Sequence, residues 1–563
     1  MADNCREIIS SQDYADFIVP YTVTGENYLN LDVACKQVAS AGYEIVHVRL
    51  DSIDELNLYN FSYYSFPKLY GLLDVGAMEA TNIIRVQEQP ALNLKGNNVI
   101  IGFIDTGIDY THPAFKNLDG TTRIISIWDQ SSMSGSTPAN FQYGTEYRRE
   151  QINEALRQED PFTIIPQIDT NGHGTSMAGI AAGSESVQDG FLGAAPAAEI
   201  AVVKLKQAKD YLKDFYFVPR DVIAYQENDI MMGIQYLINI AYTRKQPLVI
   251  CLGVGTNQGS HSGFTPLSQT LSEYGNVPQN IVVVAAGNET GRGHHYFGII
   301  EKEIGYEDVE IRVGEKEVGF SLELWAQVPE VYNIAIRSPS GEEIPQISAK
   351  LGQSQELNFI LNKTRIYVDY RIVEQRSEGF LILVRFSNLT PGIWTIRVYN
   401  TLFIHGQYHM WLPLTGFITP DTKFLRANPY TTLTTPSTAT GIMTVSAYEY
   451  NTGSIFLNSG RGNTRLGAIK PDITAPGVNI LVPRVGGGYT RKNGTSMAAA
   501  IMAGASALLL EWAIIEQKHP TMNTGEAITY FIRGADRKDT LFYPNRQWGY
   551  GTLNMYQVFE RIL

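Results

Sequence analysis

Cysteine is scarce in this 563-residue chain, with three copies at Cys5, Cys35 and Cys251. Three widely spaced cysteines form no disulfide framework, and the Cys-x-x-Cys or Cys/His spacing of a zinc site does not occur. We therefore expect free thiols in a reducing compartment, which favours a cytoplasmic location.

Basic residues are also few relative to acidic ones. The chain has 44 Lys and Arg against 57 Asp and Glu, a formal net charge of −13. A surplus of negative charge disfavours binding to nucleic acid phosphates and to anionic membrane surfaces. We expect neither nucleic acid nor a membrane as a partner.

Long hydrophobic runs are missing as well. The first residues include Asp, Glu and Arg where a secretory signal peptide has an apolar core. No apolar stretch approaches the roughly 20 residues of a membrane span. These features predict a soluble chain, and its length predicts several domains.

The first 73 residues have the pattern of a small α+β module. The segments 13–23 (DYADFIVPYTV) and 43–50 (YEIVHVRL) read as strands. Between them, residues 27–42 carry apolar residues at helical spacing, so we expect a strand–helix–strand order.

Near-continuous apolar runs begin after this module, at 98–105, 198–205, 246–253 and 280–288. Helical stretches such as 228–242 lie between them. Buried β-branched runs alternating with helices predict an α/β fold, in which a parallel sheet is covered by helices on both faces. In such a sheet, ligands bind at the edge where the strands end.

Residues 297–425 break this pattern. Short strands of alternating apolar and polar residues, separated by Gly, Ser, Pro or Asn, predict an inserted β-sandwich or jelly roll. The α/β pattern returns after it. The predicted units are 1–73, an α+β module; 74–296, the first part of the α/β domain; 297–425, the insertion; and 426–563, the second part.

Four polar residues could carry chemistry, and each also has an ordinary structural interpretation. Asp105 ends a buried strand at the ligand edge, although turn aspartates are common there. His173 lies between glycines at the head of a helix, where it is either a general base or a structural histidine. Ser496 begins a helix whose N–H groups could stabilise an oxyanion, or it simply caps that helix. Asn288 is either a donor to the same oxyanion or a turn residue.

Taken together, these residues resemble the active site of the subtilisin-like serine peptidases (subtilases). The order Asp, His, Ser is that of the family. The stretches that carry the resemblance are IDTGID (104–109), NGHGTSMAGI (171–180), AAGNE (285–289) and NGTSMAAA (493–500).

The resemblance implies a role for each residue in the hydrolysis of peptide bonds. Ser496 is the nucleophile, His173 the general base and acid, and Asp105 the group that orients His173. Asn288 and the Ser496 N–H form the oxyanion hole. The stretch CLGVG (251–255), and in it Cys251, Leu252 and Gly253, is the strand that pairs with an extended peptide substrate.

Three other residues have competing interpretations. Ser176 also follows Gly-Thr in a TSMA stretch, but it shares its turn with His173, so we expect it to cap or pack that helix. His112 is expected to be a surface-turn histidine, because a triad needs only one base. The Cys251 thiol either packs as a small residue or lines the cleft.

The N-terminal module matches the propeptide of the family. The resemblance implies that it templates folding and leaves its carboxyl end in the active site, with a self-cleaved junction near 69–77. The expected partners are therefore a polypeptide substrate and the chain's own propeptide. No cofactor is implied. Calcium would need six to eight oxygens, and Glu185, Gln188 and Asp189 offer only three.

The insertion and the short propeptide are most similar to the clostridial germination (Csp) subtilases. This resemblance implies limited proteolysis that activates another protein, and it adds the spore to the cytoplasm as an expected location. A catalytically silent scaffold and a general intracellular peptidase are the alternatives.

Overall fold

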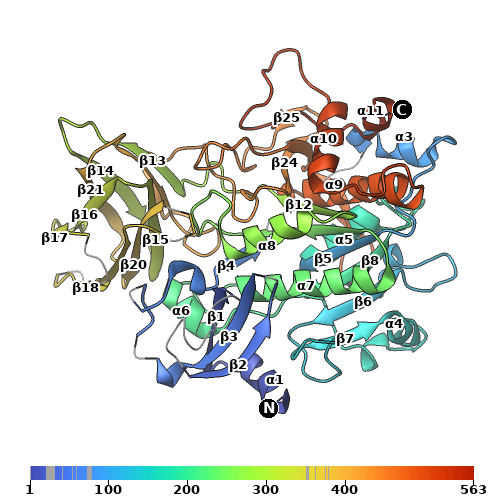
Figure 1. The fold of residues 1–563 in the computed structure, drawn as a ribbon, viewed down its shortest axis with the longest axis horizontal. Helices are drawn as coiled ribbons and strands as arrows, with labels where there is room; N and C mark the ends of the chain where they lie inside the picture. Colours follow the sequence, from blue (N-terminus) through green and yellow to red (C-terminus); the bar gives the residue numbers. More distant parts are fainter. Residues whose placement is uncertain are drawn as a thin grey trace.

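The computed structural model describes residues 2–20, 32–40, 42–53, 55–58, 60–72, 79–349, 354–361, 363–374, 376–377 and 379–562. Its centre is a mostly parallel sheet covered by helices on both faces (Figure 1), which confirms the predicted fold class. Along the sheet the order is β25-β24-β12-β10-β5-β8-β6-β7, and β26 pairs with β24. The strands are β5 (Ile100–Asp105), β6 (Ile124–Asp129), β7 (Thr145–Arg148), β8 (Glu199–Lys204), β10 (Leu248–Leu252), β12 (Asn280–Ala285), β24 (Met443–Glu449), β25 (Ser454–Ile455) and β26 (Ile473–Pro476).

The strands of this sheet are apolar throughout because both faces are covered. Alternate residues of β5 enter two different cores: Ile101 packs with one set of helices, and Ile100 with the other. The first set is α3 (Ile83–Glu88), α4 (Arg149–Ala155), α5 (His173–Ala182), α9 (Thr495–Leu510), α10 (Thr524–Gly534) and α11 (Met555–Glu560). The second includes α7 (Glu227–Arg244) and α8 (Pro266–Gly275).

The sequence analysis expected no apolar stretch as long as a membrane span, but the helix that begins with α9 is one. From Thr495 to Ile515 it is long and apolar enough, by length and composition, to cross a membrane. However, 94% of its apolar window is buried within the protein. It is the central helix of the first core, where its alanines allow the neighbouring α5 and the sheet to pack closely.

The N-terminal module is an antiparallel sheet in the order β1-β3-β2, joined by α1 (Ala2–Ser10). Its strands are β1 (Tyr14–Pro20), β2 (Val33–Val38) and β3 (Tyr43–Arg49). Strands were correctly predicted at β1 and β3, but the predicted helix over 27–42 is wrong at β2. Burial alternates along β2, with Cys35 and Gln37 buried and Lys36 exposed, which is the period of a strand. Residues 27–31 of that prediction lie outside the described residues.

The expectation of free thiols is also wrong for two of the three cysteines. Cys5 and Cys35 form a disulfide whose Cα atoms are 5.6 Å apart. The pairing escaped the sequence argument because α1 folds back onto β2, which makes residues 30 positions apart neighbours. Cys251 is free and buried.

The insertion consists of two antiparallel sheets that share one buried apolar core. Figure 1 shows it at the left, beside the parallel sheet and next to the N-terminal module. The six-stranded sheet contains, in order, β13 (His295–Ile299), β22 (Gln407–Trp411), β15 (Gly319–Gln327), β20 (Gly379–Ser387), β19 (Arg365–Arg371) and β18 (Ser354–Asn358). The five-stranded sheet contains β17 (Glu343–Ile347), β16 (Val331–Arg337), β21 (Gly392–Leu402), β14 (Tyr306–Val313) and β23 (Lys423–Phe424).

The three parts meet in a fourth apolar cluster. Phe17 and Phe66 of the N-terminal segment share it with α6 (Asp210–Tyr216) and with Trp325 of β15. The rings of Phe66 and Phe215 stack with centroids 4.4 Å apart. The N-terminal module is thus packed against both the α/β domain and the insertion.

Candidate active site

Asp105 and His173 form a buried pair at the predicted ligand edge. Asp105 is the last residue of β5, and His173 is the first residue of α5. The Nδ1 atom of His173 lies 2.8 Å from Oδ1 and 2.9 Å from Oδ2 of Asp105. The helix can begin there because Gly172 adopts φ +79°, a left-handed conformation that glycine tolerates best. An imidazole held at Nδ1 by a carboxylate presents Nε2 as a base.

Ser496 lies at the start of α9, and Gly253 connects it to the pair of Asp105 and His173. The hydroxyl of Ser496 donates a hydrogen bond of 3.2 Å to the carbonyl oxygen of Gly253. A Cβ atom on Gly253 would lie 3.0 Å from Cε1 of His173 and 2.3 Å from Sδ of Met177. Gly253 therefore lies beside both the histidine ring and the serine hydroxyl, and a side chain at this position would force Met177 or His173 to shift.

Asn288 follows β12 in a loop beside the start of α9. Its Oδ1 atom accepts hydrogen bonds from the N–H and the hydroxyl of Thr495, at 3.1 and 3.2 Å. The Thr495 hydroxyl in turn accepts one from the N–H of Gly287. These bonds assign the amide oxygen, so the Asn288 NH₂ group is the donor left for a ligand next to Ser496. The sequence analysis missed Thr495, although it stands beside Ser496 in the motif.

The predicted substrate stretch 251–255 is divided between two strands. Cys251 and Leu252 lie inside the central sheet as part of β10, where Cys251 is paired with Val283 and Phe103. Burial, with a smaller contribution from the Asp105 carboxylate, raises the pKa of the Cys251 thiol well above its ordinary value. Its side chain thus packs in the core and does not line a cleft. Only Gly253 of the three predicted residues contacts the pair of Ser496 and His173.

The strand that pairs with an extended segment is β11 (Val254–Gly255), the last two residues of the predicted stretch 251–255. It joins β4 (Leu69–Leu72) and β9 (Tyr225–Gln226) in a three-stranded antiparallel sheet with β4 in the middle. Leu72 lies opposite Val254, and Gly71 opposite Gly255. The chain's own segment, within the predicted junction 69–77, therefore forms a strand that leads toward Gly253. Residues 73–77 of that junction lie outside the described residues.

The remaining predicted residues are placed as follows. The Ser176 hydroxyl donates to the Gly172 carbonyl at 2.6 Å, so it packs within its own helix turn. His112 is buried, not on the surface: it caps the short turn at Pro113–Phe115 and contacts the Gly488 carbonyl at 2.9 Å. The His112 ring therefore joins this turn to the loop that contains Gly488.

The described residues contain no group of three or more His, Cys, Asp or Glu side chains placed to hold a metal ion. Near Glu185 and Gln188, the Asp189 carboxylate accepts a hydrogen bond from the Ser186 hydroxyl at 2.6 Å.

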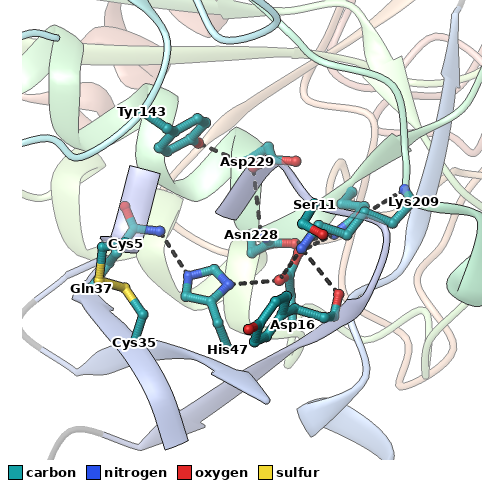
Figure 2. Close-up of polar contacts among 12 residues, drawn as sticks. Cys5, Ser11, Asp16, Cys35, Gln37, His47, Tyr143, Lys209, Asn228 and Asp229 are labelled. Carbon is teal, nitrogen blue, oxygen red and sulfur yellow. Dashed lines mark hydrogen bonds and ion pairs between the residues drawn. A yellow bond between two sulfur atoms is a disulfide. The ribbon is translucent and has the colours of Figure 1, made fainter. Parts of the chain in front are cut away.

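A buried charge cluster attaches the N-terminal module to the α/β domain, and the sequence analysis did not anticipate it. Figure 2 shows Asp16 of β1 between His47 of β3 and Lys209, with the Asp16 carboxylate 2.6 Å from Nδ1 of His47 and 2.7 Å from Nζ of Lys209. The Gln226 amide adds a third bond at 2.9 Å. Burial would raise the pKa of Asp16, but Lys209 and His47 hold it far below its ordinary value. Because Lys209 and Gln226 belong to the α/β domain, the cluster crosses the contact between the two parts.

Comparisons with known proteins agree with this geometry. Over residues 96–310 and 422–551, more than half of the chain, it matches the model of the subtilase family. The solved structure described as the Clostridium perfringens CspB protease is 32% identical, covers 85% of this chain and 97% of its own, and superposes with a TM-score of 0.76. This likeness extends to the N-terminal and inserted sheets.

Curated relatives match over shorter or more divergent stretches. The subtilisin-like protease SBT2.2 of Arabidopsis thaliana is 30% identical over 35% of this chain, which is 23% of its own length. The C5a peptidase of Streptococcus pyogenes is 22% identical over 82% of this chain and 39% of its own. The chain thus spans less than half the length of these relatives. The matched model, the similarity to CspB and the arrangement of Asp105, His173 and Ser496 lead to one conclusion: the chain belongs to the subtilase family of subtilisin-like serine proteases.

Proposed function

We propose that this chain is a serine endopeptidase that first cleaves its own N-terminal segment. The observation that carries the proposal is the meeting of Ser496 and the His173–Asp105 pair around Gly253, at the edge to which β4 leads. Ser496, His173 and Asp105 have the roles of nucleophile, general base and orienting carboxylate.

In the first step, the Ser496 oxygen forms a bond to the carbonyl carbon of the substrate, and its proton passes to Nε2 of His173. The Asp105 carboxylate accepts the hydrogen bond from Nδ1 and stabilises the imidazolium. The C–N bond then breaks, and His173 gives the proton to the leaving amine. Water repeats the sequence on the acyl-enzyme and frees Ser496.

The tetrahedral intermediate carries a negative oxygen that needs donors. The NH₂ group of Asn288 and the N–H of Ser496, at the positive end of the α9 dipole, supply them. Since Thr495 already fixes the Asn288 amide, this donor needs no reorganisation during the reaction.

The direction of β4 indicates where the cut falls. Leu72 pairs with Val254 in an antiparallel ladder, so the strand runs toward Gly253, whose carbonyl oxygen accepts a hydrogen bond from Ser496. We therefore expect the cut shortly after Leu72, within the junction 69–77, which releases the N-terminal module as a propeptide.

We test the proposal by intact-mass measurement of the purified wild-type chain and of Ser496→Ala. The wild type should appear as two fragments that meet within the junction 69–77, and a fluorophosphonate should label Ser496. The variant should remain intact and unlabelled, since loss of the nucleophile costs about six orders of magnitude in rate. An uncut, unlabelled wild type would instead favour a silent scaffold.

The proposal extends to the biological role of the peptidase. The similarity to CspB supports limited proteolysis of another polypeptide, and a role in spore germination, in the cytoplasm or the spore, is the form that the family resemblance implies. A screen of the processed protein against the proteins of its own cell would identify the substrate. Cleavage of many unrelated proteins would favour a general peptidase.

A further inference from the structure

Two buried side chains of the α/β domain hold the main chain at the beginning of β4. The N–H of Lys68 donates to Oε2 of Glu227 at 3.2 Å, and the N–H of Glu227 donates to the Lys68 carbonyl at 3.0 Å. The N–H of Leu69 donates to Oε1 of Gln258 at 3.0 Å. These three bonds lie beyond the pairing of β4 with β9 and β11, on the side away from Ser496.

Both side chains come from backbone that is held within the α/β domain. The other oxygen of Glu227 accepts a hydrogen bond from the N–H of Leu267 at 3.1 Å, which orients this carboxylate. The backbone N–H of Gln258 donates to the Thr256 hydroxyl at 3.2 Å. Glu227 is 0% and Gln258 6% exposed with the N-terminal segment in place. A peptide that replaced the segment in the same register would meet the same two acceptors.

The side chain of Tyr70 fixes the register in which these bonds form. It is fully buried and packs in the core cluster that contains Tyr225, Val254 and Leu267, all from the α/β domain. Leu69, the preceding residue, points to the opposite side and joins the cluster with Phe66. A segment anchored at the Tyr70 position is therefore aligned with Glu227 and Gln258.

We propose that Glu227 and Gln258 form a subsite that binds the substrate main chain at the positions of Lys68 and Leu69, so that efficient cleavage requires a segment extending at least that far. This inference rests on the proposed function and deepens it. The substrate class is a long extended segment of a protein, not a short peptide. Proline at the Leu69 position is excluded because it has no N–H to donate.

The test uses the self-processed full-length protein and two quenched fluorescent peptides, acetylated versions of residues 66–78 and 70–78. Each hydrogen bond contributes up to about 5-fold, so we expect kcat/KM to be about 10- to 100-fold higher for the longer peptide. The ratio does not depend on the fraction of active sites still covered by the N-terminal fragment. Equal values for both peptides would overturn the inference.

A peptide with an ester in place of the Leu69 amide tests the contact with Gln258 without altering the protein. The ester should lose about 5-fold in wild type and nothing further in Gln258→Leu. The control is Gln235→Leu on α7, whose amide contacts Asn239 and Tyr274 instead; the 5-fold loss should persist there. An equal ester effect in Gln258→Leu would refute the contact. Failure of the proposed function is distinct: Ser496 would not be labelled and no peptide would be cut.

Discussion

The negative charge of Asp16 holds the N-terminal module against the α/β domain, so its removal should detach the module. Replacing it by Asn leaves the buried ammonium of Lys209 and the ring of His47 without their counter-charge (Figure 2). Breaking a buried ion pair by removing one partner costs about 3–5 kcal/mol. At 1.4 kcal/mol per decade, the module should open at least about 100-fold more often.

Hydrogen exchange measures this opening directly. In the uncut Ser496→Ala chain, the amides of β1 and β3 should exchange at least about 100-fold faster after Asp16→Asn, whereas those of β5 and β12 should not change. The matched control is Asp51→Asn in the same module. The side chains of Asp51 and its partner Arg49 are 64% and 60% exposed, so this variant should exchange like the parent.

A second variant separates loss of the charge pair from a general loss of packing. Lys209→Met, added to Asp16→Asn, removes the uncompensated ammonium and should restore part of the protection. Wild-type protection in Asp16→Asn alone would refute the reasoning, as would a double variant that is no better protected than the single one.

Three further predictions concern other parts of the molecule. Asn288→Ala should lower the rate of self-cleavage about 10²- to 10³-fold, measured in a time course, and should lower the melting temperature slightly because the buried Thr495 N–H loses its acceptor. Burial lowers the pKa of His261 to about 4 and that of His295 to about 3. Since the unfolded chain then binds more protons than the folded one, the stability of Ser496→Ala should fall as the pH drops from about 6.5 toward 4, whereas a constant denaturation midpoint would contradict this. Reduction of the Cys5–Cys35 bond, which closes a loop of 30 positions, should destabilise the module by about 3–4 kcal/mol, read as faster exchange in β2; unchanged exchange would show that α1 is held by other contacts.

Sequence reasoning succeeded where a local pattern determines the structure. The apolar runs predicted the parallel sheet, and the alternating strands predicted the inserted sheets. Asp105 and His173 were paired from motifs 68 positions apart. Each motif combines a strand end or a helix start with the glycines that such a turn requires, so the evidence lies within a few residues.

Sequence reasoning failed where contacts between distant residues determine the structure. Residues Val33–Val38 form a strand because they pair with β3, although their apolar spacing also fits a helix. The Cys5–Cys35 bond depends on how α1 folds back, and the cluster around Asp16 depends on docking of two parts. The predicted stretch 251–255 is divided because β10 ends at Leu252 and a new strand begins after Gly253, which a continuous apolar run does not reveal.

The insertion also has a consequence for the timing of synthesis. Asn288 and Thr495, which meet at the oxyanion site, are separated by 207 positions, most of them in the two inserted sheets. A ribosome that adds about 5–20 residues per second needs roughly 10–40 s to cross that interval. During this time the nascent chain already contains His173 and its N-terminal module but not Ser496. Under the proposed function, the inserted sheets therefore delay the first cut until most of the polypeptide has been made.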